Sequence, residues 1–256
     1  MTYQIWRQDI GYENDSGNVI STGCSKLDCF LGGGLPVKGI TQIYGESGVG
    51  KTQLALQLCL KNVQEKKSGV AYISTDAIFP SKRLQELRRK IFIRNHSNVN
   101  YDRIFIEHIS SKKDFEDCIF SSKRLQYLLS KYNIQLLIID SIAGTYRFEY
   151  ETRNIIDRAK SLRKMGYQLQ KLASLHSLAV VCINQVTAVP QNLCGKQSFA
   201  RVQPSLGITW ASIVTNSFYM YKQNSHRYFY VAGSPYLPNK TIEYKILDSG
   251  VVMLTS

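Results

Sequence analysis

Short apolar runs alternate along the chain with longer segments whose hydrophobic residues recur at helical spacing. The apolar runs predict β-strands at residues 39–44, 70–75, 103–109, 135–140 and 178–184. The longer segments predict amphipathic helices at residues 52–64, 81–92, 112–131 and 155–176. Short apolar strands separated by helices are typical of a mostly parallel sheet that helices cover on both faces, so we expect an α/β fold.

The pattern changes after Trp210 to short strands rich in aromatic and β-branched residues. These strands are predicted at residues 217–221, 227–231, 241–246 and 251–254, with turn signals at 223–225 and 248–250. They predict antiparallel β-hairpins that extend the sheet. Residues 187–207 show no regular pattern, and a loop of that length inside a compact domain is usually functional or disordered.

The composition is that of a globular protein with a full-sized core. Of 256 residues, 44% are hydrophobic and 20% are charged, which fits one core domain at residues 21–256 behind a leader at residues 1–20. The sequence holds no apolar run near the roughly 18 residues that a membrane span needs. Its six cysteines form no C-x-x-C pair, which favours reduced thiols over disulfides or zinc and indicates the nucleus or cytosol.

Positive charge is concentrated in one part of the chain. Lys and Arg exceed Asp and Glu by 32 − 19 = 13, and residues 158–242 contain ten Lys and Arg residues but no acidic residue. Such a field attracts a polyanion, and nucleic-acid phosphates are the commonest large one. The alternative is a solvated basic face that has no partner.

A phosphate-binding motif follows the first predicted strand and precedes the first predicted helix. The pattern G-x-x-x-x-G-K-[ST] is matched by Gly45, Glu46, Ser47, Gly48, Val49, Gly50, Lys51 and Thr52. Its glycines let backbone N–H groups face phosphates at the positive end of the following helix. We expect Lys51 to reach the β and γ phosphates of ATP, and the Thr52 hydroxyl to bind Mg²⁺.

Polar residues close several other predicted strands at the same edge of the sheet. Asp140 ends the aliphatic run 136–139, and an acid in that position is expected in the second shell of Mg²⁺. Asp76 can act as general base for water, and the Gln185 amide can sense the γ phosphate and move the loop that follows it. For Asp140 the alternative is an ordinary strand-end cap. We therefore expect Lys51, Asp76, Asp140 and Gln185 to carry the chemistry of a nucleotide site.

The segments around these residues resemble the RecA-type recombinases of eukaryotes over residues 21–254. The matching segments, in chain order, are Gly33-Gly34-Leu35-Pro36, Gly50-Lys51-Thr52-Gln53, residues 136–141 with Tyr146-Arg147, Asn184-Gln185-Val186 and Ser234-Pro235-Tyr236-Leu237-Pro238. Residues 77–80 and 205–210 are similar to the recombinase paralogues, within the X-ray-repair cross-complementing series. The resemblance implies a RecA-like P-loop ATPase core that assists a strand-exchange recombinase in homologous recombination repair and meiosis.

The resemblance also implies roles for residues outside the phosphate motif. Gln53 continues the family's motif, and Arg83 matches the arginine that stacks on adenine. Residues 146–158 match a first DNA-facing loop, and residues 187–204 match a second one. The implied DNA contacts are Arg153, Arg158, Lys196, Phe199 and Arg201, of which Phe199 could stack on a base. The alternative for Arg83 is a solvated helix face, and for Phe199 it is packing against the domain.

The sequence departs from the family pattern at three places. Asp76 stands where the family has a water-activating Glu, and its reach is about 1.5 Å shorter, which predicts slow hydrolysis. Trp210 stands near the position of a nucleotide-sensing His. The family's small N-terminal DNA-binding domain is expected to be missing, because only the leader at residues 1–20 precedes the core. The position of this leader resembles the linker through which neighbouring subunits dock, and the alternative is an aromatic leader folded back on its own core.

We therefore predict an ATP-binding recombinase paralogue of the nucleus, with Mg²⁺ as cofactor and weak, DNA-dependent ATPase activity. Its expected partners are single-stranded DNA and either another recombinase paralogue or the strand-exchange recombinase. Two alternatives stay open, namely a fully active filament-forming recombinase and a scaffold that binds its partner without hydrolysing ATP. A helicase has less support, because the sequence shows no added motor segment.

Overall fold

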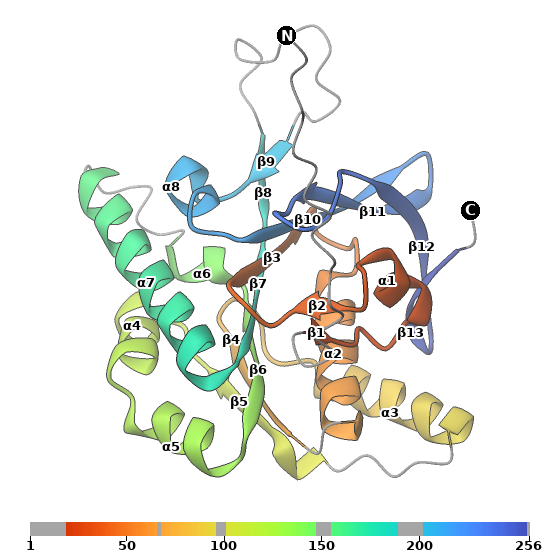
Figure 1. Ribbon diagram of the computed structural model, residues 1–256, viewed down its shortest axis with the longest axis horizontal. Coiled ribbons are helices and arrows are strands. Elements are labelled where there is room, and N and C mark those ends of the chain that lie inside the picture. The colour runs from red at the N-terminus through yellow and green to blue at the C-terminus, as the bar shows by residue number, and fades with distance from the viewer. Residues whose placement is uncertain (1–18, 66–67, 96–100, 147–154, 189–201, 255–256) are drawn as a thin grey trace, which may run out of the picture.

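A nine-stranded sheet runs through the middle of the protein (Figure 1). The computed structural model describes residues 19–65, 68–95, 101–146, 155–188 and 202–254. The strand order across the sheet is β13-β12-β11-β10-β3-β7-β6-β4-β5. Its parallel part consists of β3 (Ile40–Gly45), β7 (Ala179–Asn184), β6 (Ile134–Asp140), β4 (Gly69–Ser74) and β5 (Ile104–His108). Each of these strands was expected from the apolar runs, and both of its ends lie within one residue of the predicted ends.

The C-terminal strands extend the sheet as antiparallel hairpins, which confirms the prediction. They are β10 (Asn216–Gln223), β11 (His226–Gly233), β12 (Thr241–Leu247) and β13 (Gly250–Met253). β10 pairs in parallel with β3, and each later strand pairs antiparallel with the strand before it. Asn224 and Ser225 turn the chain between β10 and β11 with φ of 48° and 67°, the left-handed conformation that two-residue hairpin turns require.

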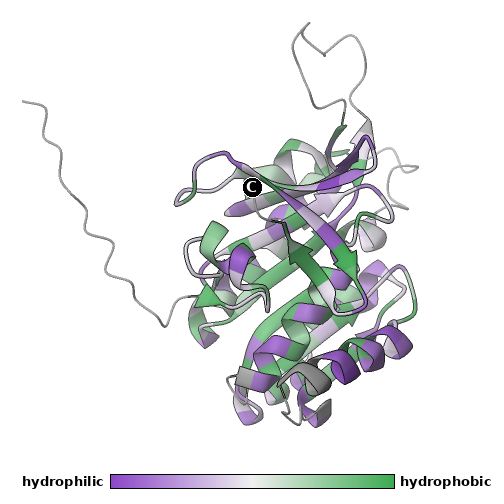
Figure 2. Cartoon of the chain, turned by 90° about the vertical axis from the view of Figure 1, so that its right-hand side faces the viewer, coloured by the Kyte–Doolittle hydropathy of each residue, from purple (hydrophilic) through white to green (hydrophobic). Residues whose placement is uncertain are grey.

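Helices cover both faces of the sheet (Figure 1). One face carries α1 (Ser25–Phe30), α2 (Lys51–Glu65) and α3 (Ser81–Asn95), and the other carries α7 (Ile155–His176) together with shorter helices. Every residue of β3, β4 and β7 is buried, as expected for strands covered on both faces. Figure 2 shows hydrophobic residues concentrated on the central strands and hydrophilic ones on the outer helices and hairpins.

The single helix predicted at residues 112–131 is wrong, because the chain forms two helices there. They are α4 (Lys112–Phe120) and α5 (Lys123–Lys131), separated by Ser121 and Ser122. The Ser122 hydroxyl accepts a hydrogen bond from the Leu125 N–H over 3.2 Å, and so caps the second helix. Serine favours this N-cap position over a helix interior, which explains the break.

The stretch at residues 187–207 also has more regular structure than its sequence pattern indicated. β8 (Val186–Ala188) and β9 (Val202–Pro204) pair antiparallel, and the short helix α8 (Gly207–Ala211) follows. Further short elements were not predicted, since two to six residues are too few to show a period: β1 (Val19–Ile20), β2 (Leu35–Pro36), α1, the 3₁₀ turn Tyr101–Arg103 and α6 (Ile142–Tyr146).

The described residues also bear on the predictions for cysteines and membrane-spanning helices. The described cysteines are free thiols, namely Cys24, Cys29, Cys59, Cys118 and Cys182. Cys59 lies in α2 and Cys182 in β7, and both are fully buried, as the sequence indicated. No helix within the described segments combines the length and the apolar character needed to cross a bilayer.

Candidate nucleotide site

The predicted site residues follow strands that are neighbours in the sheet. β3, β7, β6 and β4 are adjacent and parallel, so their carboxyl ends share one edge. In register, Tyr44 of β3 lies opposite Asn184 of β7, and Ser74 of β4 lies opposite Asp140 of β6. The residues that follow these strand ends therefore lie at one edge, where α/β proteins bind ligands.

The phosphate motif forms a loop between β3 and α2. Gly48 and Gly50 have φ of +77° and +105°, which L side chains rarely adopt. A Cβ on Gly50 would also lie 2.6 Å from Ile246 Cδ1. Because α2 begins at Lys51, the unpaired N–H groups of its first turn lie directly after this loop. The geometry is that of an anion site at a helix N-terminus.

Lys51 lies across the mouth of this loop. Its Nζ donates hydrogen bonds to the carbonyl oxygens of Gly45 and Glu46, each over 2.7 Å. Burial lowers the pKa of Lys51, while the carboxylates of Asp140 and Glu46 act in the opposite direction. The ammonium group is therefore held beside the first residues of the phosphate loop.

Asp140 lies next to the start of α2 and accepts two hydrogen bonds on one oxygen. Its Oδ2 is 2.8 Å from Thr52 Oγ1 and 2.6 Å from the Tyr72 hydroxyl. Burial raises the pKa of Asp140, and the hydrogen bonds from Tyr72 and Thr52 together with the Lys51 charge oppose that rise. A hydroxyl and a carboxylate side by side supply the oxygen atoms that Mg²⁺ prefers, so the residues present fit this ion.

Asp76 and Gln185 meet directly at the ends of β4 and β7. The Gln185 amide donates to Asp76 Oδ2 over 3.0 Å, and the Ser141 hydroxyl donates to the same oxygen over 2.6 Å. The carboxylate also lies against α6, since a Cβ on Gly144 would be 2.2 Å from Asp76 Oδ1. The Asp76 carboxylate is thus held by the ends of β6 and β7 and by α6. Gln185, which was expected near Asp76, bonds to it directly.

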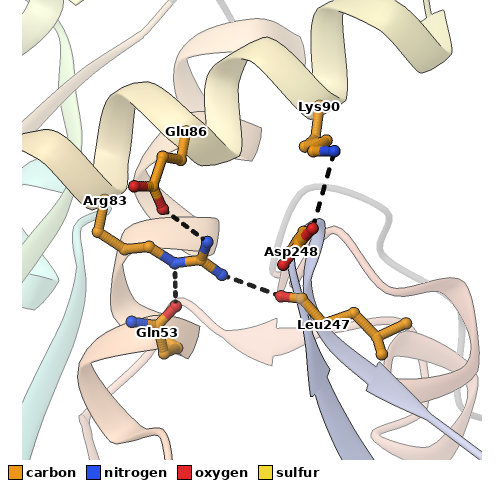
Figure 3. Close-up of polar contacts among 6 residues, drawn as sticks. All are labelled: Gln53, Arg83, Glu86, Lys90, Leu247 and Asp248. Carbon is orange, nitrogen blue, oxygen red and sulfur yellow. Dashed lines mark hydrogen bonds and ion pairs between the residues drawn. The ribbon is translucent and has the colours of Figure 1, made fainter.

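Arg83 joins α3 to α2 and to β12 (Figure 3). Its guanidinium donates to Gln53 Oε1 over 2.7 Å, to Glu86 Oε2 over 3.0 Å and to the Leu247 carbonyl over 2.9 Å. These bonds hold Arg83 beside the phosphate loop, where the resemblance implied a contact with a nucleotide base. Arg83 therefore bonds to α2 and β12 as well as to Glu86 of its own helix.

A cavity of about 540 Å³ lies between the phosphate loop, α3 and the β12–β13 turn. Lys90 and Asp248 form an ion pair of 3.8 Å that also links α3 to this turn (Figure 3). The cavity is lined by Ser47, Gly48, Gly50, Lys51, Thr52, Gln53, Arg83, Ile246, Leu247 and Asp248. It is of the size usual for small-molecule sites.

A buried polar network lies below the strand ends. Trp210 is fully buried, and its indole N–H donates to Gln42 Oε1 over 2.8 Å. The Asn184 amide donates to the same oxygen over 2.8 Å and to the Ser205 carbonyl over 2.9 Å. This network joins β3 and β7 to the segment between β9 and α8. Trp210 is therefore a buried core residue, linked through Gln42 to Asn184 at the end of β7.

The residues implied in DNA contacts are only partly within the described structure. Arg158 lies in the first turns of α7 and is half-buried. Arg153, Lys196, Phe199 and Arg201 lie outside the described residues, as does the leader from residue 1 to 18. β8 begins directly after Gln185, and antiparallel β9 ends opposite the start of β8, since Val186 pairs with Pro204. Residues 189–201 join the other ends of these two strands in the sequence.

Several functional neighbours were not found from the sequence. The Tyr72 hydroxyl donates to Asp140, and the Ser141 hydroxyl donates to Asp76. The Gln42 side-chain oxygen accepts from Asn184, which is next to Gln185 in the sequence. Only Ser141 had a signal, because it directly follows Asp140 in the sequence. The contacts of Tyr72 and Gln42 depend on which strands are neighbours, and the apolar pattern does not specify that order.

Comparisons with known proteins agree with this architecture. The sequence profile of the Rad51 family matches residues 16–253. DNA repair protein XRCC3 of Mus musculus is 40% identical over 220 residues, which are 75% of this chain and 60% of the mouse protein. DNA repair protein XRCC3 of Bos taurus is 33% identical over 253 residues, covering 91% of this chain and 74% of that protein.

A more distant relative comes from an archaeon. DNA repair and recombination protein RadA of Aeropyrum pernix is 31% identical over 251 residues, covering 95% of this chain and 76% of that protein. The chain spans about three fifths of the length of the mouse relative. The expected likeness to RecA-type paralogues is confirmed.

Proposed function

The chain belongs to the Rad51 family, and from this membership and the site geometry we propose that it is an ATP-binding recombinase paralogue. It assists homologous recombination repair and meiosis in the nucleus, where it binds single-stranded DNA and a partner paralogue. The observation that carries the proposal is the 2.8 Å contact between Thr52 Oγ1 and Asp140 Oδ2 beside the N-terminus of α2. Family membership implies nucleotide binding, and a hydroxyl beside a carboxylate supports a magnesium site next to the phosphate loop.

The chain's own residues divide the binding of ATP among them. Backbone N–H groups of the phosphate loop and the first turn of α2 bind the phosphates, and Lys51 neutralises the outer two. Gln53 and Arg83 form the wall beside the base. Thr52 would hold Mg²⁺, with Asp140 in its second shell, and the ion would supply positive charge that stabilises the transferred phosphate.

Hydrolysis is slow because of how Asp76 is held. Its Oδ2 already accepts hydrogen bonds from Ser141 and Gln185, and its side chain is one methylene shorter than that of glutamate. A general base acts only within hydrogen-bond reach of the water that it deprotonates. Gln185 donates to the acid and leads directly into β8, so it can pass a change at the γ phosphate to the segment after it.

Changing Asp76 to glutamate is expected to raise ATP turnover roughly tenfold, a part of the 10²- to 10⁴-fold that a well-placed base contributes. The added methylene lengthens the reach of the carboxylate by about 1.5 Å. Steady-state phosphate release with saturating single-stranded DNA measures the effect, and Asp76→Asn, which removes the base, is the matched control. Equal turnover of Asp76→Glu and the wild type would show that the reach of the acid is not the limiting factor.

Single-stranded DNA is the proposed polyanion for the basic part of the chain. Residues 158–242 contain no acidic residue, and they include the β8–β9 pair and the segment that joins it. Base stacking and phosphate contacts do not read sequence, so no sequence preference is expected. A strand-exchange assay with the purified protein alone tests the assisting role, because a self-sufficient filament-forming recombinase would be active without a partner.

DNA affinity is expected to fall steeply with salt. If Arg153, Arg158, Lys196 and Arg201 each neutralise one phosphate, the log–log slope is about −2.8, or roughly a 50-fold loss between about 50 and 200 mM salt. Fluorescence anisotropy of a labelled single-stranded oligonucleotide measures this slope. In the variant Lys196→Ala with Arg201→Ala the slope should become shallower by about 1.4. A salt-independent affinity would contradict the electrostatic basis of the proposal.

A further inference from the structure

The C-terminal antiparallel strands pack directly behind the phosphate loop. A Cβ on Gly45 would lie 2.1 Å from the Met220 carbonyl oxygen of β10, and one on Gly50 would lie 2.6 Å from Ile246 Cδ1 of β12. A side chain at Gly45 would require movement of the β10 backbone, and one at Gly50 would require the Ile246 side chain to move. The buried side of the phosphate loop therefore packs against β10 and β12, which come much later in the sequence.

Tyr244 of β12 makes the polar contact in this packing. Its ring is 1% exposed within the hydrophobic core, and its hydroxyl donates to the Val49 carbonyl oxygen over 2.5 Å. Burial raises the pKa of Tyr244 above its ordinary value, so the hydroxyl keeps its proton and remains a donor. The same strand continues to Leu247, whose carbonyl accepts from Arg83.

The peptide group between Val49 and Gly50 carries an N–H group that can bind phosphate only if it points to the open side of the loop. This peptide plane turns about ψ of Val49 and φ of Gly50, and glycine permits a wide range of φ, including the +105° found here. In a planar trans peptide the C=O and N–H point in opposite directions. A donor that holds the Val49 carbonyl on the buried side therefore turns the Gly50 N–H to the open side of the loop.

We propose that Tyr244 is a positioning residue for the phosphate site, because its hydrogen bond to the Val49 carbonyl aims the Gly50 N–H at the phosphates of the nucleotide. The inference rests on the proposed nucleotide binding. It adds a contribution from the C-terminal hairpin to a loop whose sequence motif ends at Thr52. Without the hydroxyl, the peptide plane would be fixed only while a phosphate is bound.

The test is Tyr244→Phe, which keeps the buried ring and removes only the hydroxyl. We expect its affinity for ADP, titrated without Mg²⁺, to be roughly three- to tenfold weaker, the usual effect of one hydrogen bond. Hydrogen exchange at the Gly50 amide should be faster than in the wild type when no nucleotide is added. Tyr132→Phe, which removes a hydroxyl after the end of α5, is the matched control and should bind ADP as the wild type does.

Rescue separates positioning from a general loss of stability. 4-Aminophenylalanine at position 244 restores a donor at the same place and should recover the wild-type ADP affinity, and it also serves if the phenylalanine variant does not fold. A Tyr244→Phe protein with a lower urea midpoint but unchanged ADP affinity and Gly50 exchange would overturn the proposal. Lys51→Ala distinguishes failure of this inference from failure of the proposed nucleotide binding. If both Lys51→Ala and Tyr244→Phe bind ADP as the wild type does, the proposed nucleotide binding has failed. If Lys51→Ala loses ADP while Tyr244→Phe keeps it, only the role of Tyr244 has failed.

Discussion

Changing Lys51 to alanine is expected to weaken ATP binding roughly 100-fold and to remove measurable hydrolysis. A hydrogen bond to a charged group contributes about 1.5–3 kcal/mol, and each 1.4 kcal/mol is a tenfold change in affinity. The Lys51 ammonium is already held 2.7 Å from the carbonyl oxygens of Gly45 and Glu46, so little ordering is needed when phosphates bind. Hydrolysis suffers further, because charge that develops on the transferred phosphate loses its nearest protein cation.

Equilibrium titration with a fluorescent ATP analogue measures the loss. Lys131→Ala is the matched control, because Lys131 is an exposed lysine at the end of α5 whose ammonium lies 4.9 Å from the centre of the Tyr127 ring. Wild-type affinity in Lys51→Ala would contradict the nucleotide site. A Lys51→Ala protein that has lost ATP but still binds its partner and supports repair would instead identify the chain as a scaffold.

Changing Trp210 to alanine is expected to lower the free energy of unfolding by about 3–5 kcal/mol, the usual cost of removing a large buried aromatic side chain. Trp210 is the largest fully buried side chain among the described residues. Its loss leaves a cavity between α8 and the sheet, and it removes the indole N–H that donates to Gln42. The Asn184 amide still donates to the Gln42 oxygen, so the lost hydrogen bond contributes less to the destabilisation than the cavity does.

Urea unfolding followed by circular dichroism measures this change. Ile208→Ala is the control on the same helix: the Ile208 side chain is 87% exposed, so a change within about 0.5 kcal/mol is expected. Trp210→Phe keeps most of the ring and should fall between the two. A loss below about 1 kcal/mol in Trp210→Ala would mean that the site repacks, and that Trp210 does not hold α8 to the sheet.

The regular part of the fold could be predicted because its information is local. A run such as residues 136–139 followed by an acid specifies a buried strand and the place where it ends, and the structure has β6 ending at Asp140. The helix at residues 155–176 was predicted with both ends correct, since its long amphipathic period leaves little ambiguity. The break at Ser121 and Ser122 was missed because capping competes with helix propensity over only two residues.

Only those residues of the candidate site that follow the ends of strands could be predicted from the sequence. Asp76, Asp140 and Gln185 were placed at one edge because parallel strands end together, and Asp76 and Gln185 are indeed in contact. The hydroxyls of Tyr72 and Tyr244, which bond to Asp140 and Val49, were not foreseen. Those bonds depend on strand order and on which face each side chain takes, and both are set by packing between distant segments.

The position of β3 within the sheet has a consequence for synthesis of the chain. Its two neighbours, β7 (Ala179–Asn184) and β10 (Asn216–Gln223), both leave the ribosome long after the glycine-rich loop has done so. During that interval both edges of a strand whose residues are all buried in the folded protein lack partners, which favours pairing with other polypeptides. A transcript cut short before Asn216 would still encode every residue of the nucleotide motif, yet its product would have no strand to close that side.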